Sequence, residues 1–256
     1  MVDYLTQLLA VADAELRKLR HDPWELASRA IQPVLWLLLF GNVMARVRGL
    51  APQSVPYLDF LAPGILAQSV LFVAIFYGIS AIWERDLGVL HRYLLSPAPR
   101  SALVAGKALS SSVRALSQAL VVYLCAAVLG VRLSLRPADV VGAIVLIALG
   151  SALFSTFSLI IACIVRTRER FMGIGQVLTM PIFFASSAIY PVALMPPWLQ
   201  FVARANPLTY EVDGLRRVML VDGISVYGLG RDLILLALGS VTMIAIATRM
   251  YPRLTE

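Results

Sequence analysis

The sequence is poor in charged residues and in the residues that hold metals or form disulfides. Only 14% of its 256 residues are charged, against about 25% in an ordinary soluble domain. Its two cysteines, Cys125 and Cys163, lie in apolar runs without a paired spacing. Its two histidines, His21 and His91, lie next to charged residues outside those runs. We therefore expect no disulfide framework, no metal site and no catalytic residue in this chain.

Motifs for energy-consuming chemistry are also missing. The nearest approach to the phosphate-binding pattern GxxxxGK[ST] is Gly106-Lys107-Ala108, which lacks both the preceding glycine and the hydroxyl residue. No intact HExxH, CxxC or GxSxG occurs, and the uncharged runs hold no Asp, Glu, His, Lys or Arg that could serve as a proton relay. The net charge of +7 is scattered over loops, which does not favour nucleic-acid binding. Any transport by this chain is expected to draw its energy from another subunit.

What the sequence has instead is long apolar stretches. Hydrophobic residues make up 59% of the chain, and about 20 helical residues cross the apolar core of a bilayer. A charge in mid-membrane costs about 2.5 to 3.5 kcal/mol, so uncharged runs mark the crossings. We predict an all-α polytopic membrane protein with one transmembrane domain and six crossing helices, at residues 28–47, 60–83, 112–131, 140–165, 171–189 and 232–249.

The distribution of basic residues predicts the orientation of these crossings. The count is made from the uncharged cores of the crossings, at 30–45, 60–83, 115–131, 140–165, 171–189 and 233–248. Of the 22 Lys and Arg residues, 14 lie before the first core, after the last, and in the second and fourth connections. The other 8 lie in the first, third and fifth connections. Because cytoplasmic loops carry the excess of Lys and Arg, both termini are predicted to face the cytoplasm.

Residues 1–22 are predicted to form an amphipathic helix that lies along the cytoplasmic membrane surface. Their apolar residues follow helical spacing and leave charged residues on the rest of the circumference. The same stripe would also suit a helix packed on a partner protein, and the pattern does not distinguish the two. The stripe consists of Leu5, Leu8, Leu9, Ala12, Leu16 and Leu19.

Residues 84–95 are predicted to form a short cytoplasmic helix. Leu87, Leu90 and Leu94 fall at i, i+3 and i+7, and the prolines at 97 and 99 end the segment. Apolar anchors flanked by charged residues suit docking on a soluble partner. A helix resting on lipid headgroups would show the same pattern. The candidate docking residues are Glu84, Arg85, Leu87, Leu90, His91 and Leu94.

The run that begins at residue 171 is too long for one crossing and is interrupted by prolines, so the fifth crossing is predicted to end near Ile189. The segment 190–221 then lies on the outer side. Its apolar clusters, separated by Asn206-Pro207, predict two short helices that enter the membrane part-way and return. Irregular backbone at that depth must be shielded by protein or line a wet cavity.

These pieces together resemble the type-2 ABC exporter permeases, and most closely the daunorubicin-resistance and nodulation-factor exporter branch. The resemblance covers nearly the whole chain. It rests on the six crossings, the amphipathic N-terminal helix and a few motifs. The motifs are Glu84-Arg85-Asp86-Leu87-Gly88-Val89-Leu90, Leu95-Ser96-Pro97, Tyr190-Pro191, Asn206-Pro207-Leu208-Thr209-Tyr210 and Asp213-Gly214-Leu215-Arg216.

The resemblance implies a permease that works as a pair with two separate ATP-binding subunits, which would bind the ATP and magnesium. Residues 84–95 would be the coupling helix that inserts into the ATPase. The segment 190–221 would cap the exit of the pathway, with an outer gate formed by Pro191, Asn206, Pro207, Leu208, Tyr210, Asp213 and Arg216. Polar residues of the crossings are candidates to line the pathway, namely Asn42, Gln68, Tyr77 and Gln176.

The expected function is export of an amphipathic drug or lipid-like substrate across a bacterial plasma membrane. Export of a glycan is the alternative, because the second and fifth crossings carry several aromatic residues. Two rivals come from other classes. A membrane anchor would recruit a soluble partner without moving a substrate, and a passive channel would equilibrate a solute without ATP. The sequence does not reveal whether the permease pairs with itself or with a homologous chain.

Overall fold

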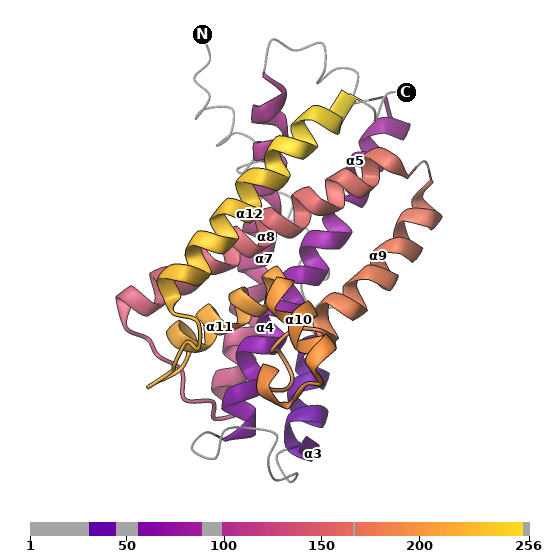
Figure 1. Ribbon diagram of the computed structural model, residues 1–256. Helices are drawn as coiled ribbons and strands as arrows, with labels where there is room; N and C mark the ends of the chain where they lie inside the picture. The colour runs from indigo at the N-terminus through magenta and orange to yellow at the C-terminus, as the bar shows by residue number, and fades with distance from the viewer. Residues whose placement is uncertain (1–30, 45–55, 89–98, 166, 253–256) are drawn as a thin grey trace.

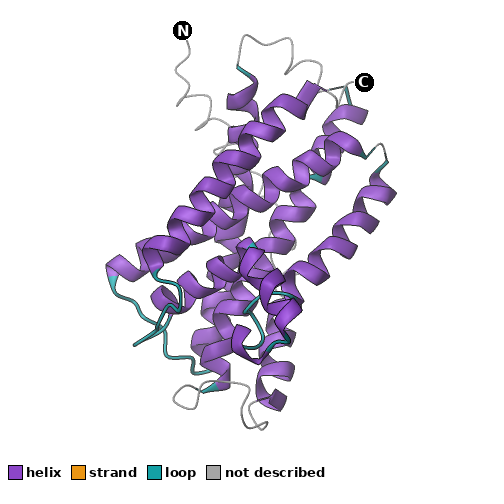
Figure 2. Ribbon diagram, in the orientation of Figure 1, coloured by secondary structure: helices purple, strands orange, loops and turns teal. Residues whose placement is uncertain are grey.

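The computed structural model describes residues 31–44, 56–88, 99–165 and 167–252, apart from the side chain of Asn42. Over these residues the chain is nearly all helical (Figure 2). The one β-type pairing among them is an isolated bridge between Leu133 and Leu220. The helices are η1 (Trp36–Gly41), α3 (Asn42–Met44), α4 (Tyr57–Tyr77), α5 (Ile79–Asp86), α7 (Arg100–Val128), α8 (Pro137–Ile164), α9 (Arg168–Phe184), η2 (Val192–Leu194), α10 (Pro197–Ala205), α11 (Pro207–Met219) and α12 (Leu229–Met250).

Four helical segments in the described part of the chain are long and apolar enough to cross a membrane. They are Tyr57–Asp86, which joins α4 and α5, together with α7, α8 and α12. Two further segments are apolar but shorter, Ile31–Gly41 and the 17-residue α9. These lengths and compositions support a polytopic membrane protein.

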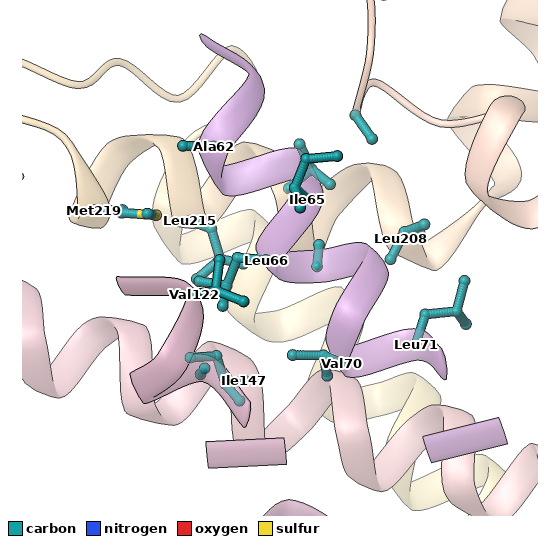
Figure 3. Packing of buried hydrophobic residues seen from close by; sticks show 14 of the residues in the cluster. Ala62, Ile65, Leu66, Val70, Leu71, Val122, Ile147, Leu208, Leu215 and Met219 are labelled. Carbon is teal, nitrogen blue, oxygen red and sulfur yellow. The ribbon is translucent and has the colours of Figure 1, made fainter. Parts of the chain in front are cut away.

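Helix α4 is the centre of the bundle. Every residue from Asp59 to Leu71 is buried, because α4 packs against α7, α8 and α11 at once. Figure 3 shows Ile65, Leu66 and Val70 pointing into the packed interior, with Val122 of α7 and Leu215 of α11 among their neighbours. An apolar helix surrounded in this way is a core element, whereas α12 is mostly exposed along its crossing window.

The shorter helices α10 and α11 lie together at one end of the bundle. At that end α4 and α8 begin and α7 ends (Figure 1). Helices α5 and α12 end, and α7 begins, at the opposite end (Figure 1). We call these the α11 end and the α5 end. Placing α11 beside the start of α4 brings the residues of the predicted outer gate next to the most buried helix of the protein.

The prediction placed the ends of the crossings at charged residues, but the structure places some of these charged residues inside helices. Helix α7 begins at Arg100 and includes Lys107 and Arg114, whereas the sequence placed that crossing at 112–131. The difference has a physical cause, since Lys107 is ion-paired with Glu84 and the Arg114 guanidinium lies 5.6 Å from the centre of the Tyr77 ring. A charge with a partner does not end a helix.

The other helices also begin or end at residues that differ from the predicted bounds of the crossings. Helix α8 begins at Pro137, whose fixed φ suits the first helical position. Helix α9 begins at Arg168, where the Thr167 hydroxyl accepts a hydrogen bond from the Arg170 backbone N–H. It ends at Phe184, shortly after Pro181, instead of near Ile189. Helices α4 and α12 likewise begin a few residues before residues 60 and 232.

The predicted coupling helix does not begin as a separate element at Glu84. Residues 84–86 form the last turn of α5, which continues the line of α4, and the helix ends at Asp86. Gly88 then adopts a positive φ of 70°, a conformation that glycine tolerates without steric cost. Residues 89–95, with Leu90, His91 and Leu94, lie outside the described residues, as does the predicted N-terminal helix 1–22.

We predict that Gly64→Ala destabilises the protein. A Cβ at Gly64 would overlap the backbone of Ala188, which cannot move aside as a flexible side chain can. Overpacking of this kind costs about 1 to 3 kcal/mol. Thermal unfolding of the detergent-purified protein should show a lower midpoint. The matched control is Gly173→Ala on α9, where a Cβ meets nothing within 4 Å. Equal midpoints for the two variants would contradict the close packing of α4.

Candidate functional site

The α5 end is held by ion pairs between three helices. The Lys107 ammonium on α7 lies 2.7 and 2.6 Å from the two carboxylate oxygens of Glu84 on α5. Both side chains are more than two-thirds buried. A charged pair that is partly shielded from water is stronger than a surface pair, and loss of one partner leaves the other charge without compensation. This contact therefore fixes the end of α5 to α7.

A second set of contacts fixes the same turn to α9. The Arg168 guanidinium donates to the Asp86 carboxylate at 2.9 Å from Nε and lies 2.7 Å from it at Nη2. The same guanidinium stacks over the Trp83 ring at 3.7 Å. Arg85 contributes a further bond to Asp86 at 3.1 Å. We call Glu84, Asp86, Lys107 and Arg168 the α5 clasp, because they join α5 to both of its neighbours.

Of the predicted docking residues, the structure places three in this region. Glu84 and Arg85 take part in the contacts above, and Leu87 is 69% exposed directly after the helix. An exposed leucine at the end of a clasped helix is available to a partner. The remaining docking residues lie beyond Gly88, outside the described part of the chain.

At the α11 end, Asn206 joins two helices. Its side-chain oxygen accepts from the Leu208 backbone N–H at 3.0 Å and so caps α11. Its amide nitrogen donates to the carbonyls of Ile182 and Ala185 at 2.7 and 2.9 Å. Asn206 thus satisfies carbonyls that the end of α9 leaves free and ties them to the start of α11.

Arg216 of α11 is buried and bonds to backbone carbonyls. Its guanidinium donates to the carbonyls of Ser187, Ala188 and Phe60, at 3.4 Å for Ala188 and 3.3 Å for Phe60. It also stacks on the Phe60 ring at 3.7 Å. The planar fork of an arginine can serve several carbonyls at once, which a lysine cannot do. Arg216 therefore holds the 187–188 backbone against the start of α4.

Asp213 organises the loop that follows α11. Its carboxylate accepts from the backbone N–H groups of Val226 and Tyr227, at 3.0 and 2.9 Å, and from the Ser225 hydroxyl at 2.7 Å. Burial raises the pKa of the Tyr227 hydroxyl, and nearby Tyr210 and Asp213 raise it further, so this tyrosine stays neutral at ordinary pH. The loop is thereby closed over the end of α11.

The other predicted gate residues have structural positions in the same region. Pro207 occupies the first turn of α11, and Leu208 is completely buried. The Tyr210 hydroxyl donates to the Arg204 carbonyl at 2.6 Å. Pro191 lines a cavity at this end. The structure thus gathers the predicted gate residues of 190–221 around one end of α4.

Two buried acidic residues at this end were missed from the sequence. Asp59 on α4 pairs with Arg132 at 3.1 Å. Asp59 lies one residue before the predicted start of the second crossing, at residue 60. Glu211 is completely buried against Gly150, where a Cβ would overlap its carboxylate. Neither oxygen of Glu211 has a hydrogen-bond partner among the described residues. The sequence predicted two short helices in this segment but not the burial of Glu211, which depends on tertiary packing.

The predicted pathway residues do not form one site. Gln68 is buried on α4 and lines a cavity of about 220 Å³ with Gln32, Ser69, Phe72 and Gln118 among others. Tyr77 lies further along the helix, beneath Arg114. Gln176 is exposed on α9, and the Asn42 side chain is not described. Of the three whose side chains the structure describes, only Gln68 faces a cavity of useful size.

Comparison with known proteins identifies the class. The sequence profile of the ABC-2 type transporter family matches residues 6–220, which is most of the chain. The protein therefore belongs to this family of transport permeases, which are membrane subunits. Such permeases normally work with ATP-binding subunits.

Comparison with individual proteins shows which permeases of this family the chain is similar to. It is 29% identical over 219 residues to a putative transport permease ycf38 of Cyanophora paradoxa, covering 83% of this chain and 74% of the relative. It is 26% identical to the daunorubicin resistance ABC transporter permease protein DrrB1 of Streptomyces coeruleorubidus, covering 78% and 70%. It is also 26% identical to nodulation protein J of Rhizobium leguminosarum bv. trifolii, covering 76% and 74%. The family and branch inferred from the motifs are confirmed.

We predict that Asn206→Ala lowers stability through loss of both its cap and its two carbonyl bonds. Leaving buried carbonyls unpaired costs about 1 to 3 kcal/mol. The midpoint of thermal unfolding in detergent should fall accordingly. Arg204→Ala is the matched control, since its side chain bonds to Gln200 at an exposed position. A fall no larger than that of the control would show that Asn206 does not join α9 to α11.

Proposed function

We propose that this chain is the membrane permease subunit of an ATP-driven exporter in a bacterial plasma membrane. It would pair with a second copy or a homologous permease and with two ATP-binding subunits. Those subunits would bind the ATP and magnesium and perform the hydrolysis. Membership of the ABC-2 family supports the transport role, and the names of the Streptomyces and Rhizobium relatives support the bacterial setting.

The observation that carries the proposal is the α5 clasp. The predicted coupling segment begins in the last turn of α5, and α5 continues α4, the most buried helix. A displacement of the coupling segment by an ATPase would therefore reach α4, while Glu84–Lys107 and Asp86–Arg168 carry it to α7 and α9. Packed helices move as rigid bodies between alternative arrangements. The clasp supplies the connection that an externally driven transporter requires.

The orientation proposed from the charge distribution fits this scheme. With six crossings and both termini in the cytoplasm, the α5 end faces the cytoplasm, where an ATPase is available. The α11 end then faces outward, and its short helices cover the exit. The two shorter apolar segments, Ile31–Gly41 and α9, would serve as the first and fifth crossings, extended by flanking residues at the interface.

For the substrate, we propose an amphipathic drug or lipid-like molecule. The name of the DrrB1 relative links a protein of this branch to resistance against daunorubicin. The cavity at Gln68 is lined by amide, hydroxyl and aromatic side chains, and no charged side chain is among its lining residues. Such a lining accepts a neutral group that carries hydrogen-bonding atoms. The stacked rings of Phe72 and Phe76 beside Gln68 would also suit a sugar, which keeps glycan export as the second candidate.

The partner can be tested by co-purification. The chain should bring down the nucleotide-binding subunit from the neighbouring reading frame, and the complex should hydrolyse ATP with sensitivity to vanadate. Leu90→Asp with Leu94→Asp should remove the ATPase, because apolar anchors would become charged. Ser101→Asp adds the same charge at the exposed start of α7 and should leave the complex intact.

The outcomes separate the candidate classes. Retention of the ATPase by the double leucine variant would overturn the coupling assignment. A complex that assembles yet never moves substrate across a vesicle membrane would favour the membrane anchor. Substrate equilibration without ATP would favour the passive channel.

The clasp predicts a charge-swap rescue. Glu84→Lys or Lys107→Glu alone places like charges side by side, and we expect ATP-driven export to fall at least about fivefold, the lower range of measured coupling between sites. The double variant restores opposite charges and should recover most of the export. ATPase binding is measured by co-purification and should be unchanged in Lys107→Glu, because Lys107, unlike Glu84, is not among the predicted docking residues. Equal export by the single and double variants would show that this pair does not transmit motion.

A further inference from the structure

The α11 end contains a cavity of about 530 Å³, which we call the outer cavity. Its wall is formed by the start of α4 (Asp59 and Phe60), by Arg216 of α11, by the segment 191–193 and by the loop 220–227, with Arg132 at one side. Small-molecule sites in proteins have volumes of about 300 to 1,000 Å³. The outer cavity is thus large enough for a ligand and is separate from the cavity at Gln68.

Most charged groups of the outer cavity are already used by the protein. Asp213 accepts three hydrogen bonds from the loop that it organises. The Arg216 guanidinium is occupied by backbone carbonyls and by the Phe60 ring. The buried Asp59 accepts a hydrogen bond from Arg132 Nε. None of these groups offers its full charge to a ligand.

Arg132 is the exception. Its side chain is 61% exposed, while the Asp59 side chain beside it is only 7% exposed. Arg132 bonds to Asp59 through Nε, and its two terminal nitrogens make no hydrogen bond with the described part of the chain. The pair therefore holds the guanidinium at the cavity while leaving its outer fork free. That fork matches the geometry of a phosphate group.

The loop beside this fork presents apolar side chains to the outside. Val221, Ile224 and Val226 all line the outer cavity and are 47%, 78% and 80% exposed. The backbone N–H of Val221 donates to the Arg132 carbonyl at 2.9 Å, so the loop and the arginine are held together. Exposed aliphatic residues around a cavity are suited to hydrocarbon rather than to water. The remaining carboxylate of the lining, Asp222, is exposed to solvent and hence screened.

We propose that the outer cavity binds a phospholipid, whose phosphate lies on the terminal nitrogens of Arg132 and whose acyl chain lies along Val221, Ile224 and Val226. This inference rests on the proposed function only in placing the α11 end at the outer leaflet. The ligand is chosen by chemistry, because a guanidinium fork with free donors together with an aliphatic rim matches a phosphate joined to a hydrocarbon chain.

The test measures lipid binding to the full-length protein, purified in detergent, by native mass spectrometry with added dioleoyl phosphatidylglycerol. We expect Arg132→Gln to weaken lipid binding about tenfold, as loss of a charge-assisted hydrogen bond implies. Arg136→Gln is the matched control, since Arg136 follows in the same loop but lines a neighbouring cavity. Millimolar inorganic phosphate should leave the lipid bound.

Two further variants guard against misfolding. Asp59→Asn combined with Arg132→Gln leaves no buried unpaired charge and should bind lipid as weakly as Arg132→Gln alone. Ala193→Trp keeps both charges and fills the cavity, so it should also lose the lipid. Wild-type binding by the double variant or by Ala193→Trp would overturn the proposal. So would an equal loss in Arg136→Gln, or displacement of the lipid by inorganic phosphate, which would indicate a site for free anions.

The lipid measurement requires no ATPase. A chain that binds phospholipid through Arg132 but recruits no ATP-binding subunit would refute the proposed function and leave the outer cavity assignment standing. An active exporter whose Arg132 variants bind lipid normally would refute the outer cavity assignment and leave the proposed function standing.

Discussion

The buried guanidinium of Arg216 is the contact on which the α11 end depends. A buried charge is costly unless its hydrogen bonds are satisfied, and here backbone carbonyls from α4 and from the segment after α9 supply the partners. The contact fixes where α11 lies, which in turn places Asp213 and its loop. It also holds Ala188 close to Gly64, where no side chain larger than hydrogen fits without displacement of the backbone. One arginine thus sets the position of three segments that are distant in sequence.

The two ends of the molecule use polar contacts, while the middle uses apolar packing. The α5 clasp joins helices through ion pairs, and the α11 end joins them through bonds to backbone carbonyls. Between these ends α4 is enclosed by apolar side chains (Figure 3). Packed apolar surfaces resist deformation because voids are costly. A displacement at one polar end is therefore expected to move α4 as a rigid body and to reach the other polar end.

The sequence predicted the apolar helices because most residues that face lipid or a packed interior must be uncharged. The predicted crossings begin later than the helices do, because Asp59, Lys107 and Asp232 lie inside α4, α7 and α12. The partners of Lys107 and Asp59 are distant in the chain, so the sequence does not reveal them. Asn206 and Arg216 were identified through resemblance to a family, since their hydrogen-bond acceptors are carbonyls that no side-chain pattern reveals. Glu211 was missed for a related reason. The space for its carboxylate exists only because residue 150, on another helix, is glycine.

The isolated bridge between Leu133 and Leu220 has a mechanical consequence. The bridge consists of two backbone bonds, in which the Ser134 N–H donates to the Met219 carbonyl and the Val221 N–H donates to the Arg132 carbonyl. The connection between α7 and α8 is therefore hydrogen-bonded to the connection between α11 and α12. The bridge ties the two connections together through backbone atoms alone, so that substitution of the surrounding side chains leaves its donors and acceptors in place.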